Sequence, residues 1–169
     1  MQSPMGIKFA DDCLTVLSQT LLAEAPNEGC ALLIGSQKQS SCFKKENTLQ
    51  IQLIWPCCNI WEPGISKLLE SQKKLHNTVK EKISKKNRFI IDPREQILAQ
   101  RWARERNLTI LGSAHSHPSG TSIPSLVDCI WSIPPRLMVI VGQFGEVRAW
   151  WVSAEQNFHP KKVAIWESK

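Results

Sequence analysis

Stretches with the residue pattern of strands alternate along this chain with stretches that have the pattern of helices. Apolar residues recur at every second position, or run continuously, in the first kind, and recur every three or four positions in the second. Such interleaving is typical of an α/β (or α+β) domain, in which helices cover a sheet. The predicted helices span 9–25, 66–86, 93–107 and 124–131, and the predicted strands span 30–35, 49–55, 88–91, 109–117, 137–142 and 146–152.

The length of 169 residues fits one domain with a core of its own, and we expect that domain to span 1–169. The longest apolar runs, 137–141 and 31–34, are far shorter than the roughly 20 residues that span a bilayer. The first residues also lack the apolar centre of a signal peptide. We therefore expect a cytoplasmic protein without membrane association, and we expect its six cysteines to be reduced thiols.

The positive charge of the chain is concentrated in one segment. Residues 67–88 include eight basic and two acidic side chains, which accounts for the net charge of +6 of the whole chain. Apolar residues at helical spacing between the lysines predict a basic helical insertion at about 57–87, lying on the domain with its lysines in water. The absence of aromatic residues among these lysines argues against single-stranded nucleic acid as a partner and favours an acidic protein surface. The apolar positions are Leu68, Leu75, Val79 and Ile83.

Two of the four histidines stand two positions apart at the predicted end of a strand. Residues i and i+2 of a strand point to the same face, about 6.6 Å apart, so His115 and His117 can converge on one cation. Pro118 ends the strand, and Asp128 on the next predicted helix can return its carboxylate to the same point. Two imidazoles and one carboxylate form a zinc site with one position open for water.

Each part of this pattern also has an interpretation without a metal. A His-x-His pair in a strand is commonly a pair of hydrogen-bonding side chains, and the run from Ser125 to Asp128 has the sequence of a helix capping box. The metal site is favoured because the histidine pair, the strand end and the carboxylate occur together. We expect the remaining histidines, His76 and His159, to lie at the surface.

The motif H-S-H-P, followed by six residues and S-x-x-D, closely resembles the motif of the JAMM (MPN-plus) metalloproteases, in particular their bacterial branch. The run P-N-E-G at 26–29, which opens a predicted strand, belongs to the same resemblance. The similarity continues from RFIIDPREQ at 88–96 to the strands at 137–142 and 146–152 and therefore covers most of the chain. Each of the five functional positions carries the residue type that the family motif has.

The resemblance implies an MPN/JAMM-type fold, a mixed β-sheet flanked by helices with a cytidine-deaminase-like architecture. It implies that zinc is bound by His115, His117 and Asp128. It further implies that Glu28 is the general base for the water at the metal, and that Ser125 helps to stabilise the tetrahedral oxyanion. The sequence around Glu28 alone predicts only an exposed turn glutamate. The capping and oxyanion roles of Ser125 are compatible.

The implied activity is that of a zinc-dependent peptidase or isopeptidase, acting at the C-terminal, Gly-Gly-like tail of a ubiquitin-like or sulfur-carrier protein. A RadC-like, nucleic-acid-associated protein is an alternative, because P-S-G at 118–120 is similar to that branch, although G-Q-F-G-E at 142–146 replaces its later Asp-His motif. A non-catalytic MPN scaffold is another alternative, and the oligomeric state is open, a homodimer included. A zinc nucleoside deaminase is excluded because Pro56-Cys57-Cys58 lacks the P-C-x-x-C ligand pair.

Overall fold

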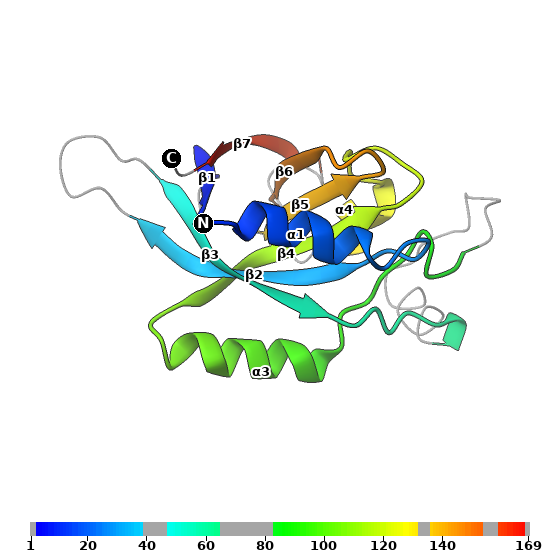
Figure 1. The fold of residues 1–169 in the computed structure, drawn as a ribbon, viewed down its shortest axis with the longest axis horizontal. Coiled ribbons are helices and arrows are strands. Elements are labelled where there is room, and N and C mark those ends of the chain that lie inside the picture. The colour runs from blue at the N-terminus through cyan, green and yellow to red at the C-terminus, as the bar shows by residue number, and fades with distance from the viewer. Residues whose placement is uncertain (1–2, 39–46, 65–82, 132–135, 154–158, 168–169) are drawn as a thin grey trace.

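A computed structural model describes residues 3–38, 47–64, 83–131, 136–153 and 159–167. The strands in these residues are β1 (Gly6–Phe9), β2 (Cys30–Lys38), β3 (Thr48–Cys57), β4 (Thr109–His117), β5 (Arg136–Gly142), β6 (Val147–Val152) and β7 (Lys161–Glu167). The helices are α1 (Cys13–Leu22), α3 (Pro93–Arg104) and α4 (Leu126–Trp131). The strands form one mixed sheet that closes into a barrel in the order β1-β3-β2-β4-β5-β6-β7. Figure 1 shows α1 and α3 on opposite sides of β2, β3 and β4.

The mixed sheet with its helices agrees with the predicted α/β class, but the closure of the sheet was not predicted. Closure depends on β1, which pairs in parallel with both β3 and β7. The predicted helix from residue 9 is wrong at its start, since Phe9 ends β1 and the helix begins at Cys13. The four residues of β1 are too few to show a periodicity, and the predictions also missed β7. Pairing between the two ends of the chain has no local sequence signal.

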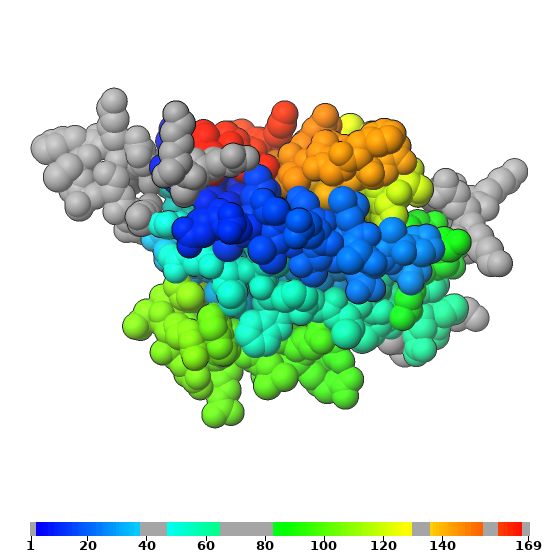
Figure 2. Space-filling model, in the orientation of Figure 1, coloured from blue at the N-terminus to red at the C-terminus, as the bar shows by residue number. Residues whose placement is uncertain are grey.

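The inner face of the barrel packs around α1 and forms the main core. Leu17 and Leu21 of α1 are fully buried in a core cluster that includes residues from every strand of the barrel. In Figure 2 this helix, in blue, lies across the near face of the molecule. The helix thus covers one side of the sheet, and the opposite side remains available for α3 and for the site described below.

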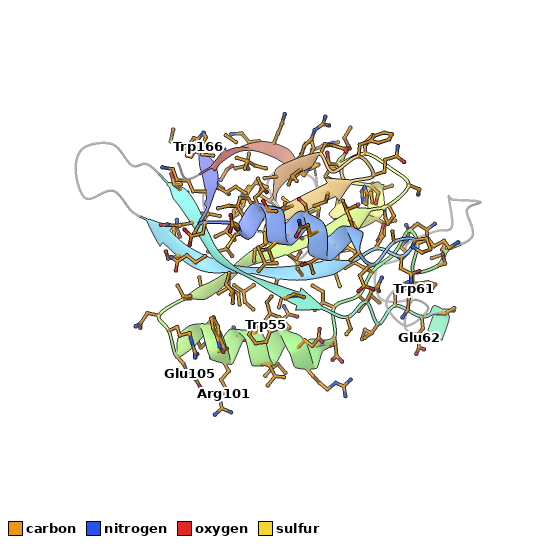
Figure 3. All side chains as sticks on the ribbon, viewed as in Figure 1. Trp55, Trp61, Glu62, Arg101, Glu105 and Trp166 are labelled. Atoms are coloured by element: carbon orange, nitrogen blue, oxygen red, sulfur yellow. The ribbon has the colours of Figure 1, made fainter. Side chains whose placement is uncertain are left out.

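A bulge in β3 divides its apolar residues between two cores. The period of two predicts a single face from Leu49 to Trp55, which is wrong. The register shifts so that Ile34 faces Leu53 and Gly35 faces Ile51, which leaves the exposed Gln52 as an extra residue in β3. Leu49 and Ile51 therefore point into the barrel, while Leu53 and Trp55 pack beneath α3. Figure 3 shows Trp55 between β3 and α3, and its ring meets the edge of Trp102 with centroids 5.8 Å apart.

The start of α3 agrees with the prediction in part. Asp92 is the N-cap, its carboxylate accepts a hydrogen bond from the Arg94 amide at 2.8 Å, and Pro93 follows it. The predicted capping box is wrong because the carboxylate of Glu95 accepts instead from the Cys58 amide at 3.0 Å. This contact ties α3 to the segment after β3. The predicted strand at 88–91 is reduced to one bridge between Ile91 and Asn59.

Most of the predicted basic helix, residues 65–82 with Leu68, Leu75, Val79 and His76, lies outside the described residues. Its predicted end at Lys86 is wrong, since residues 83–87 form a turn. Side chains of this turn accept hydrogen bonds from backbone amides, Asn87 from Ser84 and Ser84 from Lys86, and such bonds compete with helix formation. No helix in the described part of the chain has the length and apolar content needed to cross a membrane.

Candidate metal centre

The end of β4 places His115 and His117 on one face of the sheet, as the sequence predicts. His115 is fully buried, with Cys30 of β2 and Ile140 of β5 as its neighbours in register. The Nε2 atoms of the two imidazoles lie 3.0 Å apart. Asp128, on the first turn of α4, points a carboxylate oxygen at each imidazole, with distances of 3.5 Å to His115 Nε2 and 3.4 Å to His117 Nε2.

The spacing of these donor atoms fits a small tetrahedral cation. Zinc with ligands at about 2.05 Å holds neighbouring ligand atoms about 3.3 Å apart, which is the edge of the tetrahedron. The two imidazole nitrogens lie 3.0 Å apart, and one donor atom from each of the three side chains lies within 4.8 Å of the others, which is close enough for one such ion. In the described part of the chain no other group of three histidine, cysteine or acidic side chains brings its donor atoms together in this way.

The ionisation of His115 and Asp128 also suits a cation. Burial lowers the pKa of His115, which keeps its imidazole neutral and able to donate a lone pair. Burial alone would raise the pKa of Asp128, but the two imidazoles hold it far below its usual range, so the carboxylate is charged. His117 Nδ1 lies 2.8 Å from the carbonyl oxygen of Thr121, which can only accept, so the lone pair of Nε2 faces the cluster.

The loop between β4 and α4 is fixed by the hairpin of β5 and β6. The Gln143 amide donates to the Gly120 carbonyl at 2.9 Å, and the Ser122 amide donates to the Glu146 carboxylate at 3.1 Å. The indole of Trp150 donates to the Ser122 carbonyl at 2.9 Å. These contacts hold the loop that returns the chain from His117 to Asp128.

Glu28 lies beside this cluster and is buried, with 5% of its surface exposed, so the expectation of an exposed turn glutamate is wrong. Cys30 faces His115, and one residue further along the Ser116 amide donates to the Gly29 carbonyl at 3.0 Å, while the Gly29 amide donates to the Ser116 hydroxyl at 2.9 Å. Glu28 is consequently opposite His117, and side chains opposite one another in antiparallel strands share a face. Its Oε2 atom is buried without a hydrogen-bond partner among the described residues. Burial raises the pKa of Glu28 to about 8, although His117 opposes the rise.

Asn59, which the sequence analysis did not single out, fixes the backbone around Glu28. Its amide nitrogen donates to the carbonyls of Glu28 at 2.9 Å and Arg88 at 3.0 Å. Its side-chain oxygen accepts from the amides of Trp61 at 3.0 Å and Ile90 at 3.2 Å. One asparagine thus joins three segments that approach the cluster from different parts of the chain. A single asparagine in a turn-rich stretch gives no sequence signal for such a role.

The residue after Glu28 must be small. A Cβ atom on Gly29 would lie 2.5 Å from the carbonyl oxygen of Leu21 in α1, closer than a side chain can approach. Ser116 shares this contact, because its hydroxyl accepts from the Gly29 amide at 2.9 Å and donates to the same Leu21 carbonyl at 3.2 Å. The close approach to α1 fixes the position of Glu28 relative to β4.

Ser125 and Asp128 form the capping box that the sequence predicts. The Ser125 hydroxyl accepts from the Asp128 amide at 3.2 Å, and the Asp128 carboxylate accepts from the Ser125 amide at 2.7 Å. The hydroxyl proton of Ser125 is not used by either bond, so the oxyanion role stays a prediction. His159 is exposed, as expected.

A cavity of about 440 Å³ opens beside Asp128 on the same side of the sheet. Phe89 lines it and stacks on the imidazole of His115, with ring centroids 4.5 Å apart. The other walls are apolar side chains and a few polar ones from β4, β5, α3 and the segment after β3. The sequence analysis identified none of these lining residues apart from Asp128; they include Trp61, Arg88, Ile91, Gln96, Ile110, Ser113, Arg136 and Met138.

Comparison with known proteins identifies a family. A family model described as prokaryotic homologs of the JAB domain matches residues 11–153. A protein from Pyrococcus furiosus named desampylase is 32% identical over 81 residues, which cover 46% of this chain and 56% of the relative. The match thus spans little more than half the length of that relative.

Solved structures show the same fold. A protein from Desulfitobacterium hafniense, solved in solution, superimposes with a TM-score of 0.71 at 18% identity, over 96% of this chain and 93% of its own. A protein from Salinibacter ruber, also solved in solution, gives a TM-score of 0.57 at 20% identity, over 94% and 90% of the two chains.

Proposed function

The chain belongs to the prokaryotic homologs of the JAB domain, and from that premise we propose that it is a zinc-dependent peptidase or isopeptidase. The peptide or isopeptide bond that it hydrolyses lies at the C-terminal, Gly-Gly-like tail of a ubiquitin-like or sulfur-carrier protein. The observation that carries the proposal is the cluster of His115, His117 and Asp128, whose donor atoms lie within 4.8 Å of one another. The carboxylate of Glu28 lies beside it, and its Oε2 atom has no hydrogen-bond partner among the described residues. The name of the relative, desampylase, is consistent with a modifier protein as substrate.

In this mechanism His115, His117 and Asp128 hold the metal. Zinc supplies a Lewis acid, which polarises the scissile carbonyl and lowers the pKa of a water to about 7. Glu28 accepts a proton from the attacking water and passes it to the leaving amine, so that the C–N bond breaks as the water oxygen joins the carbonyl carbon. Ser125 donates its free hydroxyl proton to the developing oxyanion.

The unusual environment of Glu28 suits this work. Without a cation its carboxyl group is protonated near neutral pH, because burial raises its pKa to about 8. A divalent cation held by His115, His117 and Asp128 would favour the charged form of Glu28 and so lower the pKa of this carboxyl group. Glu28 is therefore able to accept a proton when the metal is bound.

The proposal is tested with a carrier protein whose Gly-Gly tail bears either a C-terminal extension or an isopeptide-linked lysine. Zinc-loaded enzyme is expected to release the carrier ending in Gly-Gly from at least one of them, as measured by the mass of the product. Removal of the metal with a chelator should abolish release, and added zinc should restore it. Equal release before and after complete metal removal would contradict the proposal, and so would no release from any carrier at one zinc per chain.

Substitution of Ser125 by alanine is expected to have two separable effects. Loss of the cap on α4 should lower the free energy of unfolding by about 0.5–2 kcal/mol. Loss of an oxyanion donor should lower kcat by about 10²–10³-fold with a smaller change in KM. Denaturant unfolding measures the first effect and steady-state kinetics the second.

The matched control is Asp92→Ala, which removes the side-chain cap of α3, a helix that carries none of the proposed metal ligands. It should cost similar stability and leave kcat near the wild-type value. If Ser125→Ala also keeps wild-type kcat, the serine is only a helix cap.

A further inference from the structure

Arg136 brings a positive charge into the cavity beside the metal cluster, and none of the described carboxylates balances it. The side chain is partly buried, and burial lowers the pKa of its guanidinium. No described carboxylate forms an ion pair with it. The one acidic residue that lines the cavity is Asp128, whose two oxygens already face the imidazoles.

The sheet register places Arg136 on the same face as the cluster. Ile140 of β5 is the neighbour of His115, and Arg136 lies four residues earlier, an even number that returns to the same face. The alternate residues Leu137, Val139 and Val141 point into the barrel core instead. Arg136 therefore lies on the outer face, where the cavity extends from Asp128 toward α3.

The rest of the cavity has the character of a side-chain pocket with a charged end. Trp61, whose position Figure 3 labels, lines it together with Phe89, Ile110 and Met138. A second cation, Arg88, lies on the lining. Its guanidinium also donates to the backbone carbonyl of Asn87. Apolar walls with two guanidinium groups suit a ligand that joins an apolar side chain to a carboxylate.

A desolvated guanidinium is stabilised most by a ligand with two oxygens that accept hydrogen bonds from two of its N–H groups in the same plane. Carboxylates provide this arrangement through paired, charge-assisted hydrogen bonds. A buried charge left without such a partner costs free energy, and arginine does not escape that cost by losing its proton. Because no described carboxylate pairs with Arg136, a carboxylate of the ligand is suited to this role.

We propose that Arg136 binds the free α-carboxylate of the segment that leaves during hydrolysis, so that the enzyme removes a short C-terminal extension from the carrier tail. This inference rests on the proposed function and narrows it, because an isopeptide-linked lysine within a folded protein has no such carboxylate. The bond that breaks is the peptide bond after the Gly-Gly-like end. Water supplies the hydroxyl to the carbonyl carbon and the proton to the amine, and the carboxylate held by Arg136 is unchanged.

The reach of the site limits the length of the leaving segment. Four residues of β5 separate the level of Arg136 from that of His115, about 13 Å along the strand. The long side chain of Arg136 spans part of this distance, and each extended residue of substrate spans at most about 3.6 Å. The released segment is thus one or two residues long.

The test compares carrier tails that end in Gly-Gly followed by one leucine, carrying either a free carboxylate or a carboxamide. The wild-type enzyme is expected to cleave the acid with a kcat/KM about ten- to hundredfold above that of the amide. A hydrogen bond between the guanidinium and the charged carboxylate stabilises the bound substrate by an amount that corresponds to this ratio. In Arg136→Gln this ratio should fall to about one, and Arg136→Lys should retain part of it. Both substrates are measured with the same preparation of each variant. A smaller fraction of folded protein therefore lowers both kcat/KM values equally and leaves the acid-over-amide ratio unchanged.

Arg104→Gln is the matched control, since it removes the same charge from the exposed face of α3. It should keep the wild-type acid-over-amide ratio. A wild-type ratio near one, or a ratio that survives in Arg136→Gln, overturns the inference while leaving the proposed function standing.

Binding provides a second measurement that needs no turnover. Calorimetry with Glu28→Gln protein should show tighter binding of the acid peptide than of the amide by about tenfold or more, and Glu28→Gln/Arg136→Gln should lose that preference. A binding preference without any cleavage by zinc-loaded wild type would support the carboxylate site and refute the hydrolase. Equal binding of acid and amide would refute the carboxylate site.

Discussion

Glu28→Gln is expected to slow cleavage of a carrier tail by about 10²–10⁴-fold while the fold and the metal content stay as in the wild type. Glutamine has the shape of glutamate but cannot take a proton from water near neutral pH. The structure places this change where it affects little else, because Oε2 of Glu28 has no hydrogen-bond partner among the described residues. Single-turnover kinetics with metal analysis of the same samples measures the effect.

The control for this experiment is Glu24→Gln, four residues upstream on an exposed turn. It should cleave at the wild-type rate. Wild-type speed for Glu28→Gln itself would show that Glu28 is a buried structural residue. A parallel loss of zinc and activity would show instead that its charge supports the metal rather than the proton transfer.

The local parts of the fold and the site could be predicted because their signals are local. The strand 109–117 was predicted with the bounds of β4, and it carries the His-x-His spacing. The capping box of Ser125 and Asp128 was predicted from four consecutive residues and is formed. In each case the sequence interval is short enough for backbone geometry to fix the distance between side chains.

The features that the sequence analysis missed depend on contacts between distant segments. The extra residue at Gln52 is visible only against the register of β2, and β1 becomes a strand only because β3 and β7 flank it. The burial of Glu28 follows from its place opposite His117, eighty-nine residues away in the chain. The resemblance to a family motif, and not the local pattern, pointed to that glutamate.

The role that we propose for Arg136 could not be predicted from the sequence for the same reason. At the start of a buried strand a single arginine reads as an ordinary strand end, and nothing in RLMVIVG marks a ligand. Its significance comes from the cavity, to which β4, β5, α3 and the segment after β3 all contribute. A charge whose partner is absent from the described protein can be recognised only once its surroundings are known.

His117→Ala is expected to lower the zinc content from about one ion per chain to a small fraction, and with it all metal-dependent cleavage. Three protein ligands hold the ion, and removal of one leaves a two-ligand site on a strand end. His117 is the better choice for this test than His115, which is fully buried against Phe89, so that its truncation would also open a void in the protein. The imidazole of His117 lies at the end of β4 and retains some solvent exposure.

His159→Ala is the matched control, because it removes an exposed histidine outside the cluster. Metal analysis should give the wild-type zinc content for this variant. Thermal unfolding adds an independent measurement, since an ion that binds only the folded state raises Tm. Zinc should therefore raise the Tm of the wild type and of His159→Ala and leave that of His117→Ala nearly unchanged. Equal zinc content and equal Tm shifts in all three proteins would mean that the cluster is a hydrogen-bonded group of side chains and not a metal site.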